Sequence, residues 1–238
     1  MYNRIACVSC HPKNGRGRAP DDANERMQSM LVRLSVPGTT KHGNPKPHPA
    51  YGNQLNEEGI PGVPGEGRAQ LRWEYQTIAF ADGTEIRLRK PLLTFSELNY
   101  GELEPVQTSA RIGPVVFGLG LLDAVSEEDL LQLAQQPKPD GIKGKVNRVW
   151  DTASQQDHIG RFGAKANTAS LRSQTVDAML GDLGITSSLL PKENCLPHQL
   201  QCLKSPSGGS PELKDEQLAD LEFYFRHLAI PARRNTDN

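Results

Sequence analysis

The sequence predicts a mainly α-helical, loop-rich fold with an inserted β-hairpin at about residues 71–90. The chain of 238 residues is rich in glycine (22) and proline (18), whereas hydrophobic residues make up only 36% and aromatic residues 5%. Two β-prone runs flank the dipeptide Asp82-Gly83, and the segment 211–229 repeats apolar residues at helical spacing. These observations indicate long loops around a modest core, with helices as the main regular element.

Helices are expected in four segments of the chain. They are residues 23–36, where a short helix runs into a strand, 118–136, 170–183 and 211–229. Ser126 and Asp129 resemble a capping box, which divides the second segment into two helical pieces. Pro211 follows Ser210 and suits the first position of the last helix. No internal repeat and no coiled-coil pattern is evident.

Residues 37–70 are expected to be irregular, because glycine and proline recur too often there for a long helix. A loop of this length inside a compact domain is unusual and often functional. The hairpin follows, with Asp82-Gly83 predicted as a two-residue type I′ turn. Pairing around that turn predicts one face that carries the residues Trp73, Tyr75, Ala79, Ile86 and Leu88.

The overall charge argues against binding to nucleic acid or to an acidic membrane. Lys and Arg number 27 against 28 Asp and Glu, so no strong net field surrounds the chain. No apolar run approaches the roughly 20 residues that a transmembrane helix needs. The first six residues contain no hydrophobic segment of the kind found in signal peptides.

Residues 7–11 read Cys-Val-Ser-Cys-His, which is the signature of covalent c-type haem attachment. In this chemistry Cys7 and Cys10 bind the two vinyl groups on one porphyrin edge. His11 then offers a ring nitrogen to the haem iron as its proximal ligand. An apolar porphyrin would also complete the small core that the composition predicts.

The cysteines leave other interpretations open. Cys7 and Cys10 resemble half of a zinc ribbon, with Cys195 and Cys202 as the other half, although the second pair is spaced C-x6-C rather than C-x2-4-C. A thioredoxin-like redox pair is a further alternative, but no βαβ pattern surrounds it. Cys195 and Cys202 are either a disulfide, as an oxidising compartment would allow, or two free thiols.

A series of longer motifs resembles the bacterial di-haem oxidoreductases, which are described as peroxidases or thiol oxidoreductases. The motifs occur in the order CVSCHPKNGRG, MLVRLSVPG, YGNQLNEEGIPGVPGEGR, FADGTEIRLRKP, RIGPVVFGLGLLDAV, DGIKGKVNRVWD, IGRFGAKANTASLRSQTVDAMLGDLGITS and LAIPARRN. They cover nearly the whole chain. The family is distantly similar to di-haem cytochrome c peroxidases.

The resemblance implies a cytochrome c-like domain with one covalent haem c, and a periplasmic enzyme that reduces peroxide with electrons passed between two haems. It also implies that residues 1–238 are a fragment: a signal peptide and lead-in helix would precede Cys7, and a second C-x-x-C-H domain would follow Arg233. The implied partners are a small electron-donor protein or a quinol, with peroxide or another small substrate. A monohaem electron-transfer protein and a zinc-stabilised binding module are the alternatives.

Further site residues follow from the resemblance. Di-haem peroxidases place a Glu and a Gln over the reactive haem in a Gly/Pro-rich loop, which makes Glu66 and Gln54 the candidate catalytic pair. Arg16 is a candidate for a haem propionate, and Arg111 lies in a family motif and is a candidate for a similar role. A closed, electron-transferring haem would need a sixth iron ligand. The candidates for that ligand are Met27, Met30, His42 and His48.

Overall fold

The computed structural model describes residues 1–23 and 25–234, and it contains as much strand as helix. About 24% of residues are helical and 25% lie in strands, arranged in three antiparallel sheets. The expectation of a mainly α, cytochrome c-like fold is therefore wrong. One pairing, between Met30–Thr39 and Gln107–Ile112, joins segments far apart in the sequence, which local patterns do not reveal. The pairing of Arg148–Asp151 with Gln156–Ile159 is local and was also missed.

The central sheet has three strands in the order β2–β1–β5, with β1 at Met30–Thr39, β2 at Pro45–Lys46 and β5 at Gln107–Ile112. β1 and β5 pair in regular antiparallel register from Met30 opposite Ile112 to Ser35 opposite Gln107. Residues 25–29, which were predicted to be helical, form turns that lead into β1, and residue 24 lies outside the described residues. Along β1 itself, burial alternates from one residue to the next, as in a strand, and does not follow helical spacing.

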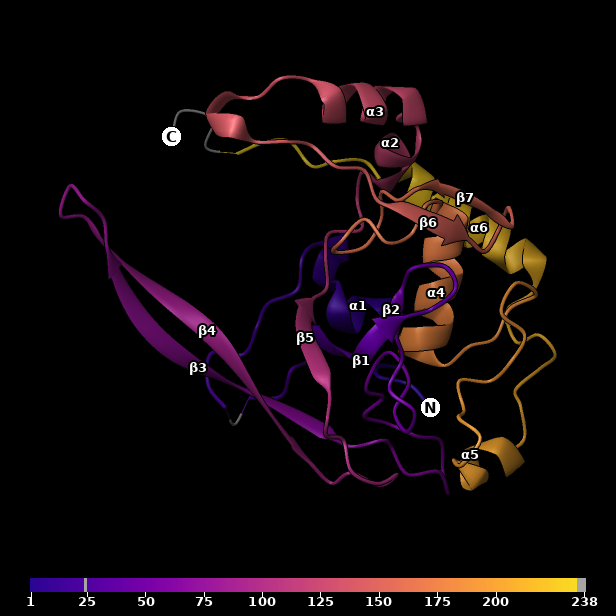
Figure 1. Cartoon of the computed structure of the whole chain (residues 1–238). Coiled ribbons are helices and arrows are strands. Elements are labelled where there is room, and N and C mark those ends of the chain that lie inside the picture. The colour runs from indigo at the N-terminus through magenta and orange to yellow at the C-terminus, as the bar shows by residue number, and fades with distance from the viewer. Residues whose placement is uncertain (24, 235–238) are drawn as a thin grey trace.

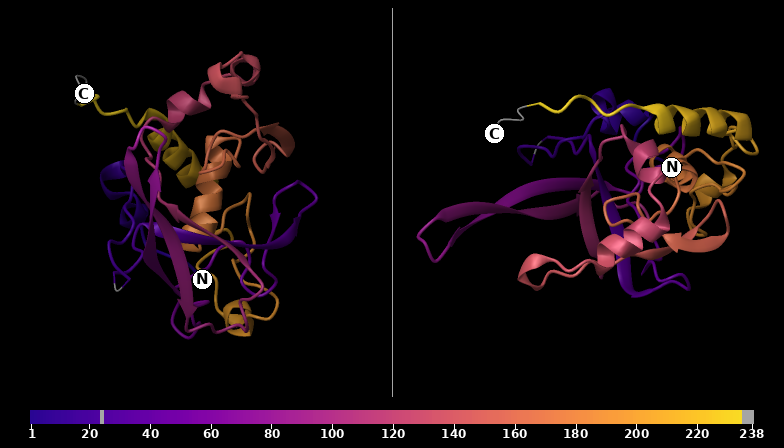
Figure 2. Two further views of the ribbon diagram at one scale, coloured as in Figure 1. Left: turned by 60° about the vertical axis from the view of Figure 1, so that its left-hand side comes forward. Right: turned by 90° about the horizontal axis from the view of Figure 1, so that it is seen from above.

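A two-stranded hairpin of β3 (Arg68–Ala79) and β4 (Glu85–Ser96) extends beyond the predicted residues 71–90 at both ends. Its outer half projects away from the rest of the molecule (Figures 1 and 2). The predicted two-residue turn is wrong: Phe80 pairs with Thr84, and three residues form the loop, with Gly83 at φ +85°.

The longer loop shifts the side chains of β4 by one position relative to the prediction. Gln76 lies opposite Leu88 and Tyr75 opposite Arg89, so Leu88 lies on the opposite face from Tyr75. Arg89 instead stacks over Trp73, with its guanidinium carbon 4.2 Å from the ring centroid. A third sheet consists of β6 (Arg148–Asp151) and β7 (Gln156–Ile159).

Six α-helices and two short 3-10 turns complete the described part of the chain. They are α1 (Cys7–Cys10), η1 (Pro12–Asn14), α2 (Leu119–Asp123), α3 (Glu127–Gln135), η2 (Pro139–Gly141), α4 (Leu171–Leu183), α5 (Leu200–Lys204) and α6 (Asp215–His227). The predicted helices at 118–136 and 170–183 are confirmed, and the hydroxyl oxygen of Ser126 accepts a hydrogen bond from the backbone N–H of Asp129. Within the described residues, no helix has the length and apolar character that crossing a membrane requires.

The last helix begins at Asp215, four residues later than predicted, so Pro211 does not occupy its first position. Residues 211–213 are held outside the helix by the segment that follows α4. The N–H of Leu213 donates to the carbonyl of Thr186 at 2.9 Å, and the carboxylate of Glu212 accepts from the N–H of Thr186 at 2.8 Å. Residues 211–213 therefore run extended beside Thr186 and do not form the predicted first turn of the helix.

The largest hydrophobic core lies between the central sheet and the base of the hairpin. Its fully buried members are Met27, Met30, Val32, Leu34, Tyr51, Leu55, Ala69, Leu71 and Leu103. A second core joins α4 to α6 through Val176, Leu213 and Leu218. In the view of Figure 1 the helix α1 appears between β5 and α4. Cys7 and Val8 are exposed and Cys10 is buried, so the cysteine motif lies at the surface with one thiol turned inward.

Candidate functional site

The cysteine motif forms one short helical turn, in which the N–H of His11 donates to the carbonyl of Cys7 at 2.9 Å. This turn brings Cys7, Cys10 and His11 close together. Cys7 is exposed, whereas Cys10 is buried with its thiol 3.5 Å from the carbonyl oxygen of Gln28. Both cysteines are free thiols, so neither is committed to another covalent bond.

The imidazole of His11 is oriented by a backbone carbonyl. Its Nδ1 lies 2.6 Å from the carbonyl oxygen of Pro114. Because a carbonyl oxygen only accepts hydrogen bonds, Nδ1 carries the proton and Nε2 presents its lone pair. Metal-binding histidines are usually fixed in this way, with the second ring nitrogen donating to a carbonyl or carboxylate. The ring is therefore in the tautomer that an axial ligand needs.

The motif is packed closely against the end of β5. A Cβ atom added at Gly113 would lie 2.8 Å from the carbonyl oxygen of Cys10 and 3.2 Å from Cε1 of His11. The N–H of Gly17 donates to the carbonyl of Gly113 at 2.9 Å, and the N–H of Gly113 donates to Ser29 at 2.9 Å. These contacts fix the backbone of the motif relative to the central sheet.

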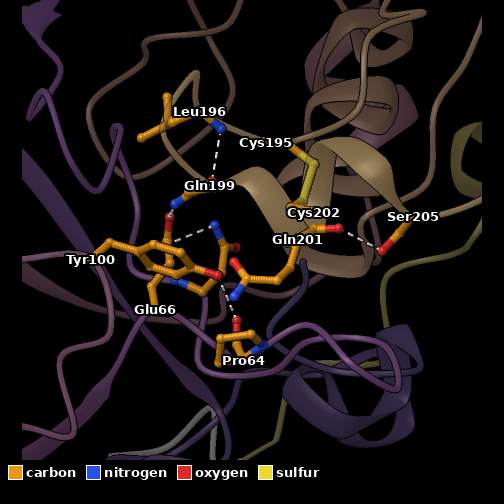
Figure 3. The surroundings of a disulfide bond; sticks show 10 residues. Pro64, Glu66, Tyr100, Cys195, Leu196, Gln199, Gln201, Cys202 and Ser205 are labelled. Atoms are coloured by element: carbon orange, nitrogen blue, oxygen red, sulfur yellow. Dashed lines mark hydrogen bonds between the residues drawn. A yellow bond between two sulfur atoms is a disulfide. The ribbon is translucent and has the colours of Figure 1, made fainter.

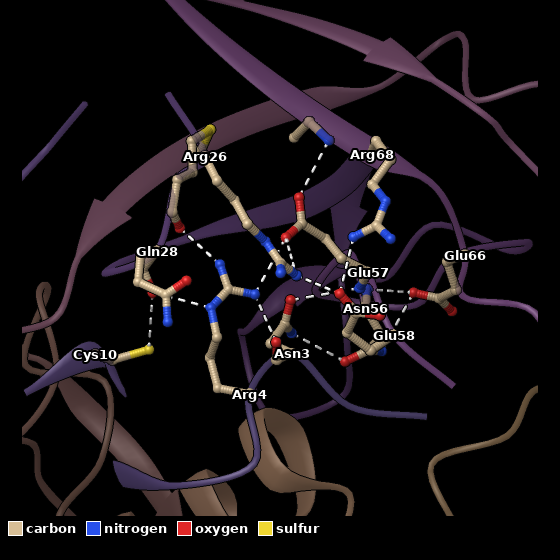
Figure 4. A network of polar contacts seen from close by, with 12 residues as sticks. Asn3, Arg4, Cys10, Arg26, Gln28, Asn56, Glu57, Glu58, Glu66 and Arg68 are labelled. Atoms are coloured by element: carbon tan, nitrogen blue, oxygen red, sulfur yellow. Dashed lines mark hydrogen bonds and ion pairs between the residues drawn. The ribbon is translucent and has the colours of Figure 1, made fainter. Parts of the chain in front are cut away.

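Arg4 anchors the segment that precedes the motif (Figure 4). Its buried guanidinium donates to the carbonyls of Gln28 at 2.9 Å and Met27 at 2.7 Å. It also forms an ion pair with Glu57 at 3.1 Å, in which both side chains are less than 10% exposed. Cys10 contacts the same carbonyl oxygen of Gln28. Arg4 therefore fixes the loop at residues 27–28, against which the cysteine motif packs. The sequence analysis missed this residue, because nothing local distinguishes it from other arginines.

Glu66 is buried and lies in a hydrogen-bond network close to the Cys195–Cys202 disulfide (Figure 3). Its carboxylate accepts from the backbone N–H of Asn56 at 2.7 Å and from the side-chain amide of Gln199 at 2.8 Å. Burial raises the pKa of Glu66 to about 7, against the lowering effect of these donors. The carboxyl is therefore able to exchange a proton near neutral pH.

Gln54 belongs to a different network from Glu66. Its side-chain amide donates to the carbonyl of Gly181 at 2.8 Å and to the carboxylate of Asp182 at 2.9 Å. Its Oε1 is buried and accepts no hydrogen bond from the described residues. The structure thus buries both members of the predicted catalytic pair but gives them no shared contact.

The four candidates for a sixth iron ligand are engaged in other contacts. Met27 and Met30 are core residues. His42 stacks on Trp150 with ring centroids 4.5 Å apart, and Nδ1 of the buried His48 accepts from the N–H of Ala50 at 3.1 Å.

The remaining predicted residues lie apart from one another. Cys195 and Cys202 form a disulfide with their Cα atoms 5.7 Å apart. Because they are bonded to each other, they cannot be the second half of a zinc ribbon, and residues 1–23 and 25–234 contain no group of three or more metal-binding side chains. Arg16 is exposed and makes no hydrogen bond or ion pair with described residues, which leaves its guanidinium available.

A free cysteine pair followed by a histidine with an available Nε2 fits the attachment of a haem. The chain matches the family model described as "Di-haem oxidoreductase, putative peroxidase" over residues 1–238. It therefore belongs to the di-haem oxidoreductase family, as the motifs indicated. No curated protein and no solved structure matches the chain.

Proposed function

We propose that the chain is the c-type haem-binding part of a periplasmic di-haem oxidoreductase that reduces peroxide with electrons passed between two haems. In this proposal Cys7 and Cys10 hold one haem covalently and His11 binds its iron. The bound haem supplies the one-electron chemistry that no amino-acid side chain offers. A second haem domain after residue 238 and a signal peptide before Cys7 are part of the same proposal.

The hydrogen bond from His11 to Pro114 is the observation that carries this proposal. It fixes the tautomer and the ring plane of His11 before any ligand is present. The two thiols fit the same group, because they are uncombined and lie on the same helical turn. The residues present therefore match what covalent haem attachment requires.

Gln54 and Glu66 are proposed to serve the peroxide reaction by different means. The free Oε1 of Gln54 can accept a hydrogen bond from a hydroxyl group and so orient a bound peroxide. Glu66, with its pKa near 7, can hold and release a proton at the pH of the reaction. The two residues lie in separate networks, so proton transfer from Glu66 to a substrate near Gln54 would need an intervening donor such as water.

The disulfide supports a location outside the cytoplasm, because structural disulfides persist in oxidising compartments. In such a compartment the electron donor would be a small redox protein or a quinol. The balanced charge of the chain gives no long-range preference for a strongly charged partner.

The alternative is a monohaem electron carrier, which needs a firm sixth ligand on the iron. The core positions of Met27 and Met30 argue against that ligand, and so do the contacts of His42 and His48. An open iron position and a peroxidase-like reaction are therefore favoured.

The test is the oxidised absorption spectrum of the chain, exported with a signal peptide in cells that carry the haem-maturation machinery. A high-spin band that changes on addition of hydrogen peroxide supports the peroxidase-like proposal. A low-spin spectrum that peroxide leaves unchanged supports the electron carrier instead. The variants Met27→Ala, Met30→Ala, His42→Ala and His48→Ala would then identify the sixth ligand.

A further inference from the structure

The central sheet presents two different faces. Along β1, Met30, Val32 and Leu34 point into the main core. Strand alternation places Arg33, between them, on the opposite face. Arg33 of β1 lies opposite Ser109 of β5, and Arg111 is two residues beyond Ser109 in β5. The two arginines are therefore diagonal neighbours on the face away from the core.

This face is turned toward the cysteine motif. The hydrogen bond from Gly113 to Ser29 continues the ladder of β1 and β5 by one pair. Gly113 therefore points to the same side of the sheet as Arg111, and a Cβ atom there would contact Cys10 and His11. Burial raises the pKa of Asp182 in α4, and the nearby charge of Arg33 opposes this rise, so this carboxyl also lies near the face that carries Arg33.

Neither guanidinium group forms an ion pair with the described residues. The carboxyl groups of Asp177 and Asp182 in α4 feel the charge of Arg33, but no ion pair joins either of them to it. Arg111 makes one weak hydrogen bond, to the hydroxyl of Ser109 at 3.4 Å. Burial and the nearby charge of Arg33 lower the pKa of Arg111.

Two partly buried like charges that lie side by side are unfavourable unless anions neutralise them. A haem carries two such anions, its propionate carboxylates, on one edge of the porphyrin. Guanidinium groups match carboxylates through paired N–H donors. We propose that Arg33 and Arg111 form a guanidinium pair that binds the two propionates of the haem held at residues 7–11. This inference rests on the proposed function and adds the residues that orient the cofactor.

The sequence analysis named Arg16 for this role and Arg111 for a similar one, and of the two Arg16 is exposed. A carboxylate bound there would remain in water, where an ion pair contributes little. Arg33 and Arg111 are only partly exposed, and each extends from a strand rather than from a loop. The sheet therefore offers the more rigid and less solvated site.

The experiment uses the haem-loaded chain with three variants: Arg33→Gln, Arg111→Gln and the control Arg89→Gln. Arg89 lies on the projecting hairpin over Trp73, away from the motif. The readouts are the midpoint potential of the haem and the propionate-bending band in the resonance Raman spectrum. Loss of a positive charge beside the haem favours the oxidised iron. Arg33→Gln and Arg111→Gln should therefore lower the potential and shift the bending band, while Arg89→Gln changes neither.

Unchanged potential and bending band in both sheet variants, with haem attached, would overturn the propionate proposal. If a glutamine variant fails to attach haem, the lysine variant at the same position decides, because lysine keeps the charge but not the paired donors. A shifted bending band in that variant supports the proposal and an unchanged band overturns it. Absence of haem in the unaltered chain is a different outcome, because it would contradict the proposed function itself.

Discussion

The side-chain amide of Gln199 donates a hydrogen bond to Glu66 at 2.8 Å, joining residues 133 positions apart in the sequence. Gln199 is fully buried and lies between the two cysteines of the disulfide. The disulfide loop therefore supplies one of the donors that surround the buried carboxyl. Two of the following predictions depend on this link.

The first prediction concerns the pH dependence of stability. Burial raises the pKa of Glu66 to about 7 in the folded chain, above its ordinary value of 4.5. The folded state therefore binds a proton more tightly, and the free energy of unfolding should fall as the pH rises from 4.5 to 7. The contribution is roughly 3 kcal/mol. Urea denaturation at several pH values measures it.

Glu66→Gln is the matched variant for this measurement, because glutamine has nearly the same shape and does not titrate. It should give a flatter dependence of stability on pH over the same interval. Asp182, whose pKa burial also raises, contributes a slope of the same sign in both proteins. Equal slopes in the two proteins would show that Glu66 does not have a raised pKa.

The second prediction concerns the disulfide. The bond closes a loop between residues seven positions apart, and the variant Cys195→Ser with Cys202→Ser should lose about 2.5 kcal/mol of stability. It should also weaken the hold of Gln199 on Glu66 and so change the pH dependence described above. Denaturation under oxidising and reducing conditions measures both effects. A double variant as stable as the unaltered oxidised chain would argue against a structural role of the bond.

The third prediction concerns Arg4. Arg4→Met leaves the buried carboxylate of Glu57 without its nearest partner, and it should lower the free energy of unfolding by about 3–5 kcal/mol. Arg18→Met is the control, since the Arg18 side chain is 68% exposed and its ion pair with Asp21 should contribute less than about 1 kcal/mol. Thermal and urea denaturation compare the two. Similar losses in both variants would contradict the anchoring role of Arg4.

The fourth prediction concerns the packing of the motif. Gly113→Ala places a Cβ atom against the backbone of Cys10, which cannot easily move. The expected cost is about 1–3 kcal/mol, together with a lower fraction of chains that attach haem. Gly181→Ala in α4 is the control, because its nearest atom would be 3.9 Å away. This variant should be unchanged or up to about 1 kcal/mol more stable. Haem attachment reduced equally by both substitutions would contradict the close packing of the motif.

The sequence predicted local features better than the architecture. The helices at 118–136 and 170–183 carry capping residues and apolar spacing within themselves, so they could be found without knowledge of their partners. The central sheet could not, because β1 pairs with β5 more than 60 residues later in the chain. The hairpin was recognised from Asp82-Gly83, but one extra loop residue reversed the faces of β4.

At the candidate site, too, local features could be predicted from the sequence and long-range contacts could not. Residues 7–11 form a short local motif, and the sequence alone predicts their chemistry. The orientation of His11 depends on Pro114, which is 103 positions away, and the burial of Glu66 depends on Gln199. The sequence held one usable signal for Arg33. It lies between Val32 and Leu34, which are buried, so in a strand its side chain faces away from the core.

The most direct test of the account is the mass of the intact chain after export in cells with haem-maturation machinery. The account predicts one haem covalently attached to the unaltered chain, and none attached through both cysteines in Cys7→Ser or Cys10→Ser. A folded chain with the Cys195–Cys202 disulfide formed and no covalent haem would contradict the central claim.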